Sequence, residues 1–458
     1  MATIAALDAE RVETLRGAFS GTVLTPDDES YDDVRRVHNG LIDRHPALIA
    51  RCLGTADIAD AIRFAGDNGL EITVRGGGHN VAGRAVADGA VMIDLSLMKG
   101  MYVDQDARTV RAQGGVLWGE LNRETAVHGL AVTGGVISTT GIAGLTLGGG
   151  LGWLMPKYGL AIDNLLSVDI VTADGEAITA STGENPDLFW AVRGGGGNFG
   201  VATSFEYQLH PVRTVVGGLV AHPFPAARDL LRFVREFAQE LPDELMIAAG
   251  LVHAPDGSGV KLAAVVVCHC GAEEQANEDL KPLLEFGEPA MIDVGPMPYP
   301  VLNTILDAAF PKEALNYWKS SFLRDLEDDL IDLMTASFEV APSPMSSVLL
   351  EHFHGAVSRI GETATAWPHR TPGFNLVITG EWVDPAATDE NVAWVRSLYS
   401  ELEPYVSGRR YVNYLDADEG DDAVQSAFGP NYERLVKIKA TYDPENVFRH
   451  NQNIPPAG

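Results

Sequence analysis

The chain has 458 residues, of which 46% are hydrophobic and 21% are charged, a balance typical of soluble globular proteins. At about 150 residues per domain, this length predicts more than one domain. The formal net charge of −30 disfavours nucleic acid and anionic membranes as partners, because binding to either needs basic patches.

No stretch of about 18 apolar residues occurs, so the sequence predicts no membrane span. The N-terminal segment carries acidic side chains within a helical pattern and lacks the basic start and apolar run of a secretory signal. The three cysteines, Cys52, Cys268 and Cys270, form no disulfide framework, which predicts a cytoplasmic protein. The excess of acidic residues fits either a high-salt cytoplasm or a simpler role in solubility.

Short helices and strands alternate through the first 130 residues. A helix is expected over 56–65 because Ile58 and Ile62 share one face, with Thr55 as its N-cap and Gly69 at its end. The other expected elements of this region are a helix over 31–40, strands over 46–53 and 90–98, a hairpin over 101–115 and a helix over 116–130. This order is typical of a mixed α+β layout.

The stretch from Ile72 to Arg84, ITVRGGGHNVAGR, begins as a half-buried strand and continues into three glycines. Glycine lets the backbone adopt positive φ, and successive N–H groups in such a turn form a concave nest for anions such as phosphate. His79 follows directly, which would place a nucleophilic ring beside a phosphate site. The same residues also fit a tight turn with a solvated histidine.

Two further glycine clusters lie at 140–154 and 193–200, and the second contains the pattern G-x-G-x-x-G. A dinucleotide-binding fingerprint follows a strand and opens a helix. This one follows an expected helix over 187–193 and precedes an expected strand over 201–209, so a Rossmann interpretation is rejected. No glycine run is followed by G-K-[ST], which rejects a P-loop as well.

The glycine clusters stop near residue 215, and a region of strands and helices follows that predicts a separate domain with an antiparallel sheet backed by helices. Its expected elements are strands within 219–225 and 251–271, with a Pro-Asp-Gly turn at 255–257, strands over 346–357 and 373–382, and a helix over 272–286. Cys268, His269 and Cys270 alternate between the two faces of one strand, and no matching Cys/His pair exists elsewhere. We therefore interpret them as core residues and predict no metal site.

Several motifs match one family in order along the chain: RGGGHNVAG, TGIAGLTLGGGLGWL, KYGLAIDNLLSVDIVTADG, RGGGGNFGVAT, YVNYLD and DPENVFRHNQNIPP. Together they resemble the berberine-bridge-enzyme-like branch of the vanillyl-alcohol-oxidase flavoproteins, and are similar to bacterial 6-hydroxynicotine oxidases and oligosaccharide oxidases. The resemblance covers nearly the whole chain and implies an α+β, two-lobed PCMH-type FAD-binding fold. It implies an FAD-binding domain over 1–215, a substrate-binding domain over 216–405, and a C-terminal segment over 406–458 that returns to the FAD domain.

The resemblance also assigns residues to FAD. His79 would carry a covalent bond to the flavin, and the backbone from Arg75 to Asn80 would wrap the pyrophosphate. Many relatives have a second covalent link through a cysteine where this chain has Ile137, so we expect attachment through His79 only. Gly76 replaces a serine that is frequent in relatives, which loosens the turn. The other residues that the resemblance places around FAD are Gly77, Gly78, Thr140, Gly141, Gly144, Gly149, Gly150, Asp163, Asn164, Gly200, Val201 and Asn453.

Enzymes of this family remove a hydride from a C–OH or C–N carbon, which needs a base within hydrogen-bond reach. Tyr414 matches a tyrosine that serves as the base or its partner, with Asn413 positioning it. Its ordinary pKa near 10 requires a neighbouring group to make it effective, and a packed aromatic is its alternative role. Candidates for substrate contact, each with core packing as the alternative, are Tyr317, Trp318, His352, His354 and Thr379, and Glu351 lies on the same strand as the two histidines.

The resemblance implies an oxidase that acts on a small molecule (a sugar, alcohol, amine or natural product) with molecular oxygen as acceptor. The alternatives are a flavin dehydrogenase with poor oxygen reactivity and a flavin-bearing binding protein. In relatives, one side chain before the glycine pair beside the flavin controls the approach of oxygen, and Thr140 holds that position here. Its small β-branched shape leaves the path open, although its hydroxyl could hold a water molecule. No oligomeric state follows from the sequence.

Overall fold

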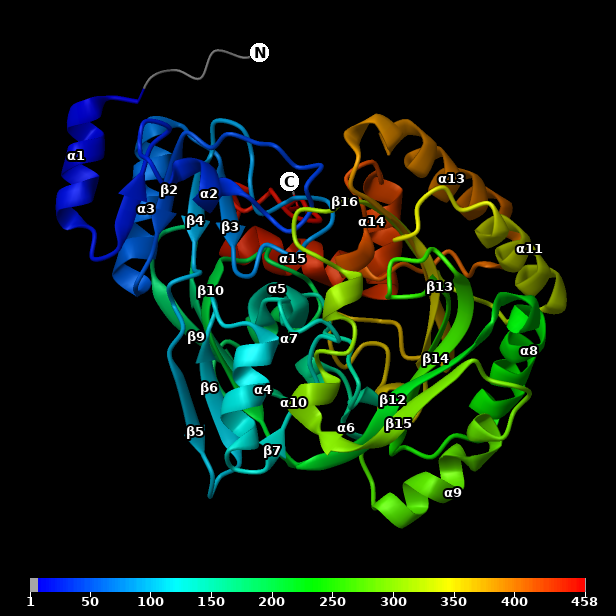
Figure 1. Cartoon of the computed structure of the whole chain (residues 1–458). Coiled ribbons are helices and arrows are strands. Elements are labelled where there is room, and N and C mark those ends of the chain that lie inside the picture. The colour runs from blue at the N-terminus through cyan, green and yellow to red at the C-terminus, as the bar shows by residue number, and fades with distance from the viewer. Residues whose placement is uncertain (1–6, 458) are drawn as a thin grey trace.

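The structure, a computed structural model, describes residues 7–457 as two lobes that face each other (Figure 1). The outer part of the first lobe is a four-stranded sheet in which β2 and β3 pair in parallel with β4, while β1 pairs antiparallel with β2. Its strands in sheet order are β1 (Thr22–Leu24), β2 (Leu48–Arg51), β4 (Val91–Asp94) and β3 (Ile72–Arg75). Helix α3 (Thr55–Asn68) packs on this sheet through Ile58, Ile62 and Ala65.

A five-stranded antiparallel sheet completes the first lobe. Its strands in order are β5 (Met101–Asp104), β6 (Thr109–Gln113), β10 (Val201–Gln208), β8 (Leu165–Val171) and β9 (Ala177–Ser181). The helices of this part are α4 (Trp118–Ala126), α5 (Ile142–Leu147), α6 (Met155–Tyr158) and α7 (Pro186–Val192). The core beneath the sheet contains Trp118, Phe189, Phe205 and Tyr207, all buried.

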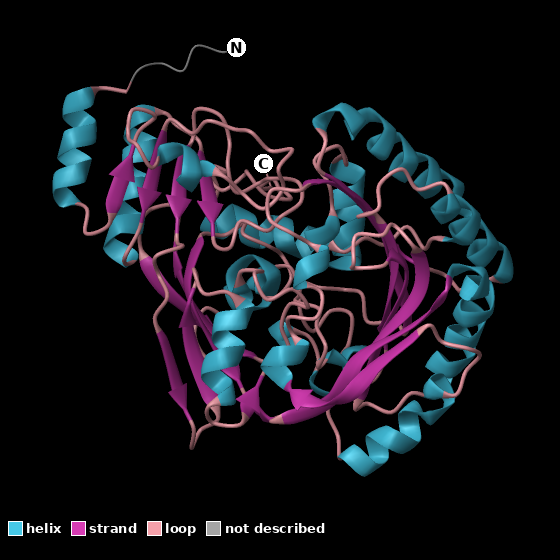
Figure 2. Ribbon diagram, in the orientation of Figure 1, coloured by secondary structure: helices cyan, strands magenta, loops and turns pink. Residues whose placement is uncertain are grey.

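The second lobe is a curved seven-stranded sheet with antiparallel pairing throughout. Its strands in order are β15 (Met291–Pro298), β12 (Thr214–Pro223), β14 (Lys261–His269), β13 (Leu245–His253), β17 (Ser347–Phe353), β18 (Gly373–Trp382) and β16 (Leu315–Phe322). Its outer face is covered by α8 (Ala227–Phe237), α9 (Glu273–Leu284), α11 (Asp328–Glu339) and α13 (Thr388–Glu401) (Figure 2). The inner face is turned toward the first lobe.

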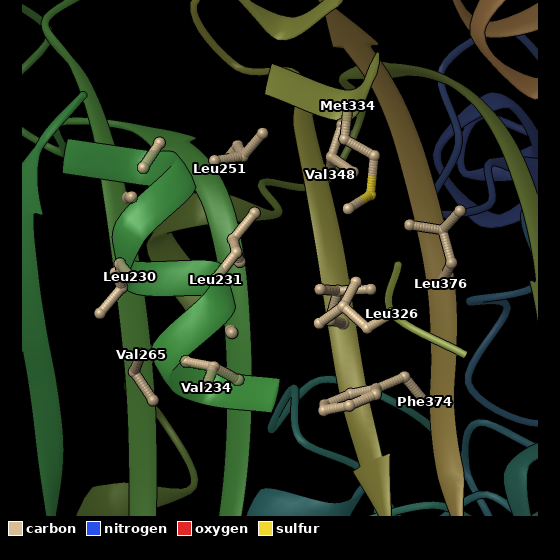
Figure 3. Close-up of a cluster of buried hydrophobic side chains, with 14 of the residues drawn as sticks. Leu230, Leu231, Val234, Leu251, Val265, Leu326, Met334, Val348, Phe374 and Leu376 are labelled. Carbon is tan, nitrogen blue, oxygen red and sulfur yellow. The ribbon is translucent and has the colours of Figure 1, made fainter. Parts of the chain in front are cut away.

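Apolar side chains of the covering helices hold this sheet in place. Figure 3 shows Leu230, Leu231 and Val234 of α8 against the strands that carry Leu251 and Val265. All five are at most 1% exposed, so the outer face of the sheet is a continuous core. Burial of one such side chain stabilises the fold by about 1.5–3 kcal/mol.

The C-terminal segment returns to the first lobe. Helices α14 (Asp421–Phe428) and α15 (Tyr432–Tyr442) pack Phe428 and Leu435 into the core of the five-stranded sheet. The short turn η7 (Val412–Tyr414) lies between the lobes, because Val412 packs with the first core and Trp318 of β16 contacts Tyr414. The α+β fold with a helix-backed antiparallel sheet, expected from the sequence, is confirmed.

Most expected elements are present, with ends that differ by several residues, and two of the differences concern how a helix begins or ends. Gly69 ends α3 with φ +62°, as expected, but Thr55 is the first helical residue and Gly54 is the N-cap. The helix expected over 31–40 ends at Arg35. The backbone beyond it turns away because His38 N donates to Gly78 O (2.9 Å) and the Asn39 side chain donates to Val81 O (2.7 Å). Contacts between distant segments therefore override the local helical preference.

The Cys-His-Cys triplet lies at the end of β14, as expected for core strand. Cys268 and His269 are fully buried, and His269 Nε2 lies 3.0 Å from Asp279 Oδ2 of α9. No helix within residues 7–457 is both long and apolar enough to cross a bilayer.

Candidate functional site

A cavity of about 630 Å³ lies between the two lobes, within the size range of cofactor and small-molecule sites. The three glycine clusters and the C-terminal segment line one side of it, and the inner face of the seven-stranded sheet lines the other. The glycine clusters, which are up to 120 residues apart in sequence, thus meet around one space as the sequence predicts.

The turn after β3 forms part of the cavity wall through Gly76, Gly77, Gly78, His79 and Asn80. Gly78 has φ +66°, a conformation that favours glycine, and a Cβ on Gly77 would lie 2.4 Å from the backbone N of Gly141. Two glycine turns therefore touch backbone to backbone, which leaves main-chain N–H groups at the wall of the cavity.

Arg75 does not line the cavity, although it belongs to the predicted turn. Its guanidinium lies behind the turn and pairs with the fully buried carboxylate of Asp94 at 2.7 Å. Asp94 Oδ1 also accepts from Ser96 N. Arg75 therefore holds the end of β3 in place from behind the cavity wall. The residues that follow it, from Gly76 to Asn80, line the cavity.

His79 is accessible from the cavity and is stacked on His38, with ring centroids 3.8 Å apart. Its Nε2 atom has no hydrogen-bond partner among residues 7–457. Burial, with a smaller contribution from His38, lowers the pKa of His79 to about 3. The imidazole is therefore neutral at pH 7 and keeps a lone pair on one ring nitrogen, the state required of a nucleophile.

The second and third glycine clusters contribute Thr140, Gly141, Gly144, Gly197 and Gly200 to the cavity wall. A Cβ on Gly144 or Gly197 would meet no protein atom within 4 Å. Protein packing therefore does not require glycine at these two places. Glycine at these places would instead let a flat or elongated group in the cavity approach the backbone closely.

Three other predicted positions of these clusters support the wall from behind. A Cβ on Gly149 would lie 2.8 Å from the Trp367 ring, and one on Gly150 would lie 2.3 Å from Ala161. Gly150 N also donates to the hydroxyl of Tyr411 at 3.1 Å. Val201 packs in the core of the outer sheet rather than against the cavity.

Asp163 and Asn164, predicted to contact FAD, do not line the cavity. Both carboxylate oxygens of Asp163 accept from the Arg370 guanidinium, at 2.7 and 2.8 Å, and both side chains are at most 5% exposed. The Asn164 amide donates to Tyr158 O and Leu160 O. These bonds tie the glycine-rich segment to the loop that carries Arg370.

Asn453 lies next to the cavity but does not line it, whereas Asn451 and Gln452 do. The Asn451 amide donates to Gly197 O at 3.2 Å, and Asn198 donates to Gln452 O at 3.1 Å. The C-terminus is therefore tied to the third glycine cluster by the two residues just before Asn453, the residue predicted to contact FAD.

Tyr414 lines the cavity and donates a hydrogen bond from its hydroxyl to Glu351 Oε1 at 2.9 Å. The other carboxylate oxygen accepts from the Asn375 amide of β18 at 2.9 Å. Burial raises the pKa of Glu351 above its usual range, and burial together with the Glu351 charge raises that of Tyr414 well above 10. Tyr414 is therefore neutral, and Glu351 is the member of the pair that titrates.

From the sequence, Glu351 is noted on the strand of His352 and His354, but it is not assigned to catalysis. Its position in the sheet indicates a special role, because Glu351 faces the polar side chain of Asn375 across the pairing of β17 and β18. An acidic side chain on the inner face of a strand otherwise rich in valine and leucine marks an unusual site.

Asn413 lines the cavity as well, but it does not bond to Tyr414. Its amide donates to Leu145 O (3.1 Å) and to the Tyr411 hydroxyl (2.8 Å). A Cβ on Gly148 would lie 2.1 Å from Asn413 Oδ1, so glycine is required at that point. Asn413 thus joins the η7 turn to the second glycine cluster.

Of the candidates for substrate contact, the structure brings Trp318 and Thr379 to the cavity and keeps Tyr317, His352 and His354 away from it. Strand alternation is the reason: Tyr317 points opposite to Trp318 and donates to Asp418, while His352 points opposite to Glu351 and packs on Phe374. His354 stacks on His352 and has Nε2 3.2 Å from Pro242 O. Thr379 has its hydroxyl engaged with Ser347 Oγ at 2.6 Å.

Comparison with known proteins agrees with this geometry. A family model described as "FAD binding domain" matches residues 46–181, and one described as "Berberine and berberine like" matches residues 410–455. The chain belongs to the FAD-linked oxidoreductases of the berberine bridge enzyme-like and 6-hydroxynicotine oxidase family, with their PCMH-type FAD-binding fold.

Among its relatives, (R)-6-hydroxynicotine oxidase of Paenarthrobacter nicotinovorans is 34% identical, over 96% of this chain and 98% of the relative. The crystal structure of 6-hydroxy-D-nicotine oxidase from Arthrobacter nicotinovorans superposes with a TM-score of 0.88 and 32% identity, over 96% of this chain and 98% of that one. The grass pollen allergen Phl p 4, with glucose dehydrogenase activity, gives a TM-score of 0.86 at 25% identity, over 95% and 97% of the two chains.

The residues present fit FAD. The positive-φ turn at Gly78 and the open faces of Gly144 and Gly197 leave room for an extended cofactor along the first lobe. His79 is a neutral imidazole on the same wall, and Ile137, at the position of the second attachment in relatives, also lines the cavity.

Proposed function

We propose that the protein is an FAD-dependent oxidase that removes a hydride from a C–OH or C–N carbon of a small organic substrate and reduces oxygen to hydrogen peroxide. The observation that carries this proposal is the hydrogen bond between Tyr414 and Glu351 at the wall of the FAD cavity. A partly buried carboxylate with a raised pKa is a stronger base than a fully solvated one, as proton abstraction requires.

In this mechanism Tyr414 passes on the proton of the substrate O–H or N–H group. Its hydroxyl oxygen receives that proton while its own proton moves to Glu351 Oε1, along the 2.9 Å hydrogen bond. The proton therefore ends on Glu351, and Tyr414 is neutral before and after the step. Asn375 holds the other carboxylate oxygen, which orients Glu351 toward Tyr414. When bound, FAD supplies the hydride acceptor.

The glycine turns and His79 would hold the cofactor opposite this pair. The backbone of Gly76 to Asn80 would bind the pyrophosphate, with Gly141, Gly144 and Gly200 along the rest of the molecule. Trp318, whose ring lies edge-on to Tyr414 with centroids 6.0 Å apart, would cover the substrate from the side of the sheet.

The alternative is a dehydrogenase that uses an acceptor other than oxygen, which the glucose dehydrogenase activity of the similar Phl p 4 supports. The two functions separate in one experiment, in which protein reduced anaerobically by substrate is mixed with oxygen and peroxide is measured. The oxidase reoxidises within seconds and forms one peroxide per flavin. Reoxidation over minutes would establish the dehydrogenase instead.

We expect FAD to be attached covalently through His79 alone. Protein precipitated with acid should stay yellow, while the His79→Ala variant should release its yellow colour into the supernatant because the only attachment point is gone. Peptide mapping checks the single link: the flavin should be found on one peptide that contains His79. A flavin attached to any second residue would contradict it.

Thr140 is expected to leave oxygen a path, because it lines the cavity with a short β-branched side chain. The Thr140→Leu variant adds bulk at this point and should slow reoxidation by oxygen about 10-fold or more, which corresponds to a barrier raised by about 1.4 kcal/mol. Anaerobic reduction by substrate should be unchanged, and Thr140→Val serves as the control of matched shape. Equal reoxidation rates for all three proteins would remove Thr140 from the oxygen path.

A further inference from the structure

Arg84 is a charged side chain at the cavity that neither the fold nor the proposed mechanism uses. It lies in the loop between β3 and β4, five residues after His79. Among the described residues that line the cavity, it is the only lysine or arginine, and Glu351 is the only carboxylate. Most of the remaining wall is apolar or glycine, so Arg84 is the single fixed positive charge among the described residues of this wall.

The guanidinium of Arg84 forms no ion pair and no hydrogen bond with the side chains or backbone of residues 7–457. Its buried Nε lacks a hydrogen-bond partner, and only its backbone N is engaged, at 3.4 Å from Asn80 Oδ1. Burial lowers the pKa of Arg84, but arginine stays protonated in proteins. Arg84 is only partly exposed, and a buried Nε without a partner is costly, so this arrangement points to an anion that pairs with the guanidinium when bound.

The nearest acidic influence on Arg84 comes from Asp416, which does not fill that role. Asp416 favours the charged form of Arg84, but its two oxygens accept from the backbone N of Trp318 (3.0 Å) and of Ala417 (2.5 Å). The guanidinium donors of Arg84 are therefore left for a group that enters the cavity.

The position of Arg84 places the entering anion near the Tyr414–Glu351 pair, on the side of the cavity where the substrate would bind. Asp416 bonds to Trp318, and the Trp318 ring packs against Tyr414, the residue next to Glu351. The loop before Arg84 is held to the substrate sheet by Asn39, whose amide donates to Val81 O (2.7 Å) and Asn316 O (2.9 Å). Arg84 thus belongs to the wall where the two lobes meet around the Tyr414–Glu351 pair.

We propose that Arg84 binds a carboxylate of the substrate, so that the protein acts on alcohols or amines that carry a carboxylate away from the reacting carbon. This inference rests on the proposed function for the identity of the reacting group. The planar guanidinium matches a carboxylate through two parallel hydrogen bonds, and a single cation balances a single negative charge. A phosphate dianion would be left with excess charge in a cavity without lysine or a second arginine.

Binding of a non-reacting probe tests the site without turnover. The FAD-loaded protein is titrated with benzoate and with the neutral benzamide by calorimetry, with the flavin absorption spectrum as a second readout. Because a hydrogen bond to a charged group contributes about 1.5–3 kcal/mol, benzoate should bind about 10- to 100-fold more tightly than benzamide. Equal affinities for the two probes would overturn the proposal.

Two variants and a control assign the preference to Arg84. Arg84→Gln should abolish the preference for benzoate, and Arg84→Lys, which keeps the charge but not the planar fork, should retain part of it. The control Arg228→Gln removes an exposed arginine that pairs with Asp332 and should change nothing. An unchanged preference in Arg84→Gln would overturn the assignment.

The phosphates of FAD are the other anion that could pair with Arg84. The Arg84→Gln variant distinguishes a role in substrate binding from a role in FAD binding. If Arg84→Gln purifies with its FAD content unchanged and loses the benzoate preference, Arg84 serves the substrate. If it loses FAD and keeps the preference, Arg84 serves the cofactor and the proposal is overturned. A benzoate preference in a protein that no alcohol or amine reduces would contradict the proposed oxidation while leaving the carboxylate site intact.

Discussion

Replacement of Glu351 by glutamine or of Tyr414 by phenylalanine is expected to slow reduction of the flavin by substrate about 10²- to 10⁴-fold, the usual contribution of general base catalysis. Each change removes one member of the proton path and preserves the shape of the side chain. The Tyr414 hydroxyl donates only to Glu351, so packing and FAD content should be retained. Stopped-flow measurement of anaerobic reduction gives the rate directly.

The pH dependence of flavin reduction is a second readout, which would not change if Glu351 had only a structural role. Glu351 accepts the proton only when it is ionised, and burial raises its pKa. Reduction by substrate should therefore be slow at low pH and rise as the pH passes through the raised pKa of Glu351. In Glu351→Gln this rise should be absent. A Glu351→Gln protein that keeps both the parental rate and the parental pH profile would exclude Glu351 as the base.

The second large effect concerns the ion pair between Asp163 and Arg370. Removal of one partner from a buried pair leaves an uncompensated charge and typically costs 3–5 kcal/mol, so Arg370→Met should lower the free energy of unfolding by about that amount. This pair is a buried ion pair of that kind, because it has two parallel hydrogen bonds and both side chains are buried. Urea unfolding of the FAD-loaded protein measures the loss.

The double variant Asp163→Leu/Arg370→Met is the matched test of the cause, because replacement of both charges by apolar groups is often close to neutral. It should recover most of the lost stability. Arg228→Met breaks an exposed pair and should change stability by no more than about 1 kcal/mol. A double variant as unstable as Arg370→Met would show that lost packing, rather than the unpaired Asp163 charge, causes the effect.

Local patterns in the sequence predict those parts of the molecule that local physics decides. Gly69 ends α3 in the left-handed conformation, and β5 and β6 form the expected hairpin. The glycine clusters were predicted to meet around one cofactor, and they do line one cavity. In each case a backbone conformation or a close approach that favours glycine is needed over a few adjacent residues, and the glycines themselves indicate it in the sequence.

The sequence predicts less well where a side chain takes its role from a distant segment. Asp163 lies within a family motif, but its partner Arg370 is 207 residues away, and only the fold shows that the two form an ion pair. Glu351 gains its importance from Tyr414, 63 residues further along the chain. The helix expected over 31–40 ends early for the same reason, since the backbone of His38 bonds to Gly78.

Anaerobic mixing of the FAD-loaded protein with sugars, secondary alcohols, amines and their carboxylate-bearing counterparts tests the central proposal most directly. We predict that at least one class bleaches the yellow flavin and that the same compound bleaches Glu351→Gln far more slowly. If no compound bleaches a flavin that dithionite reduces readily, or if the variant is bleached at the parental rate, hydride removal assisted by the Tyr414–Glu351 pair is contradicted.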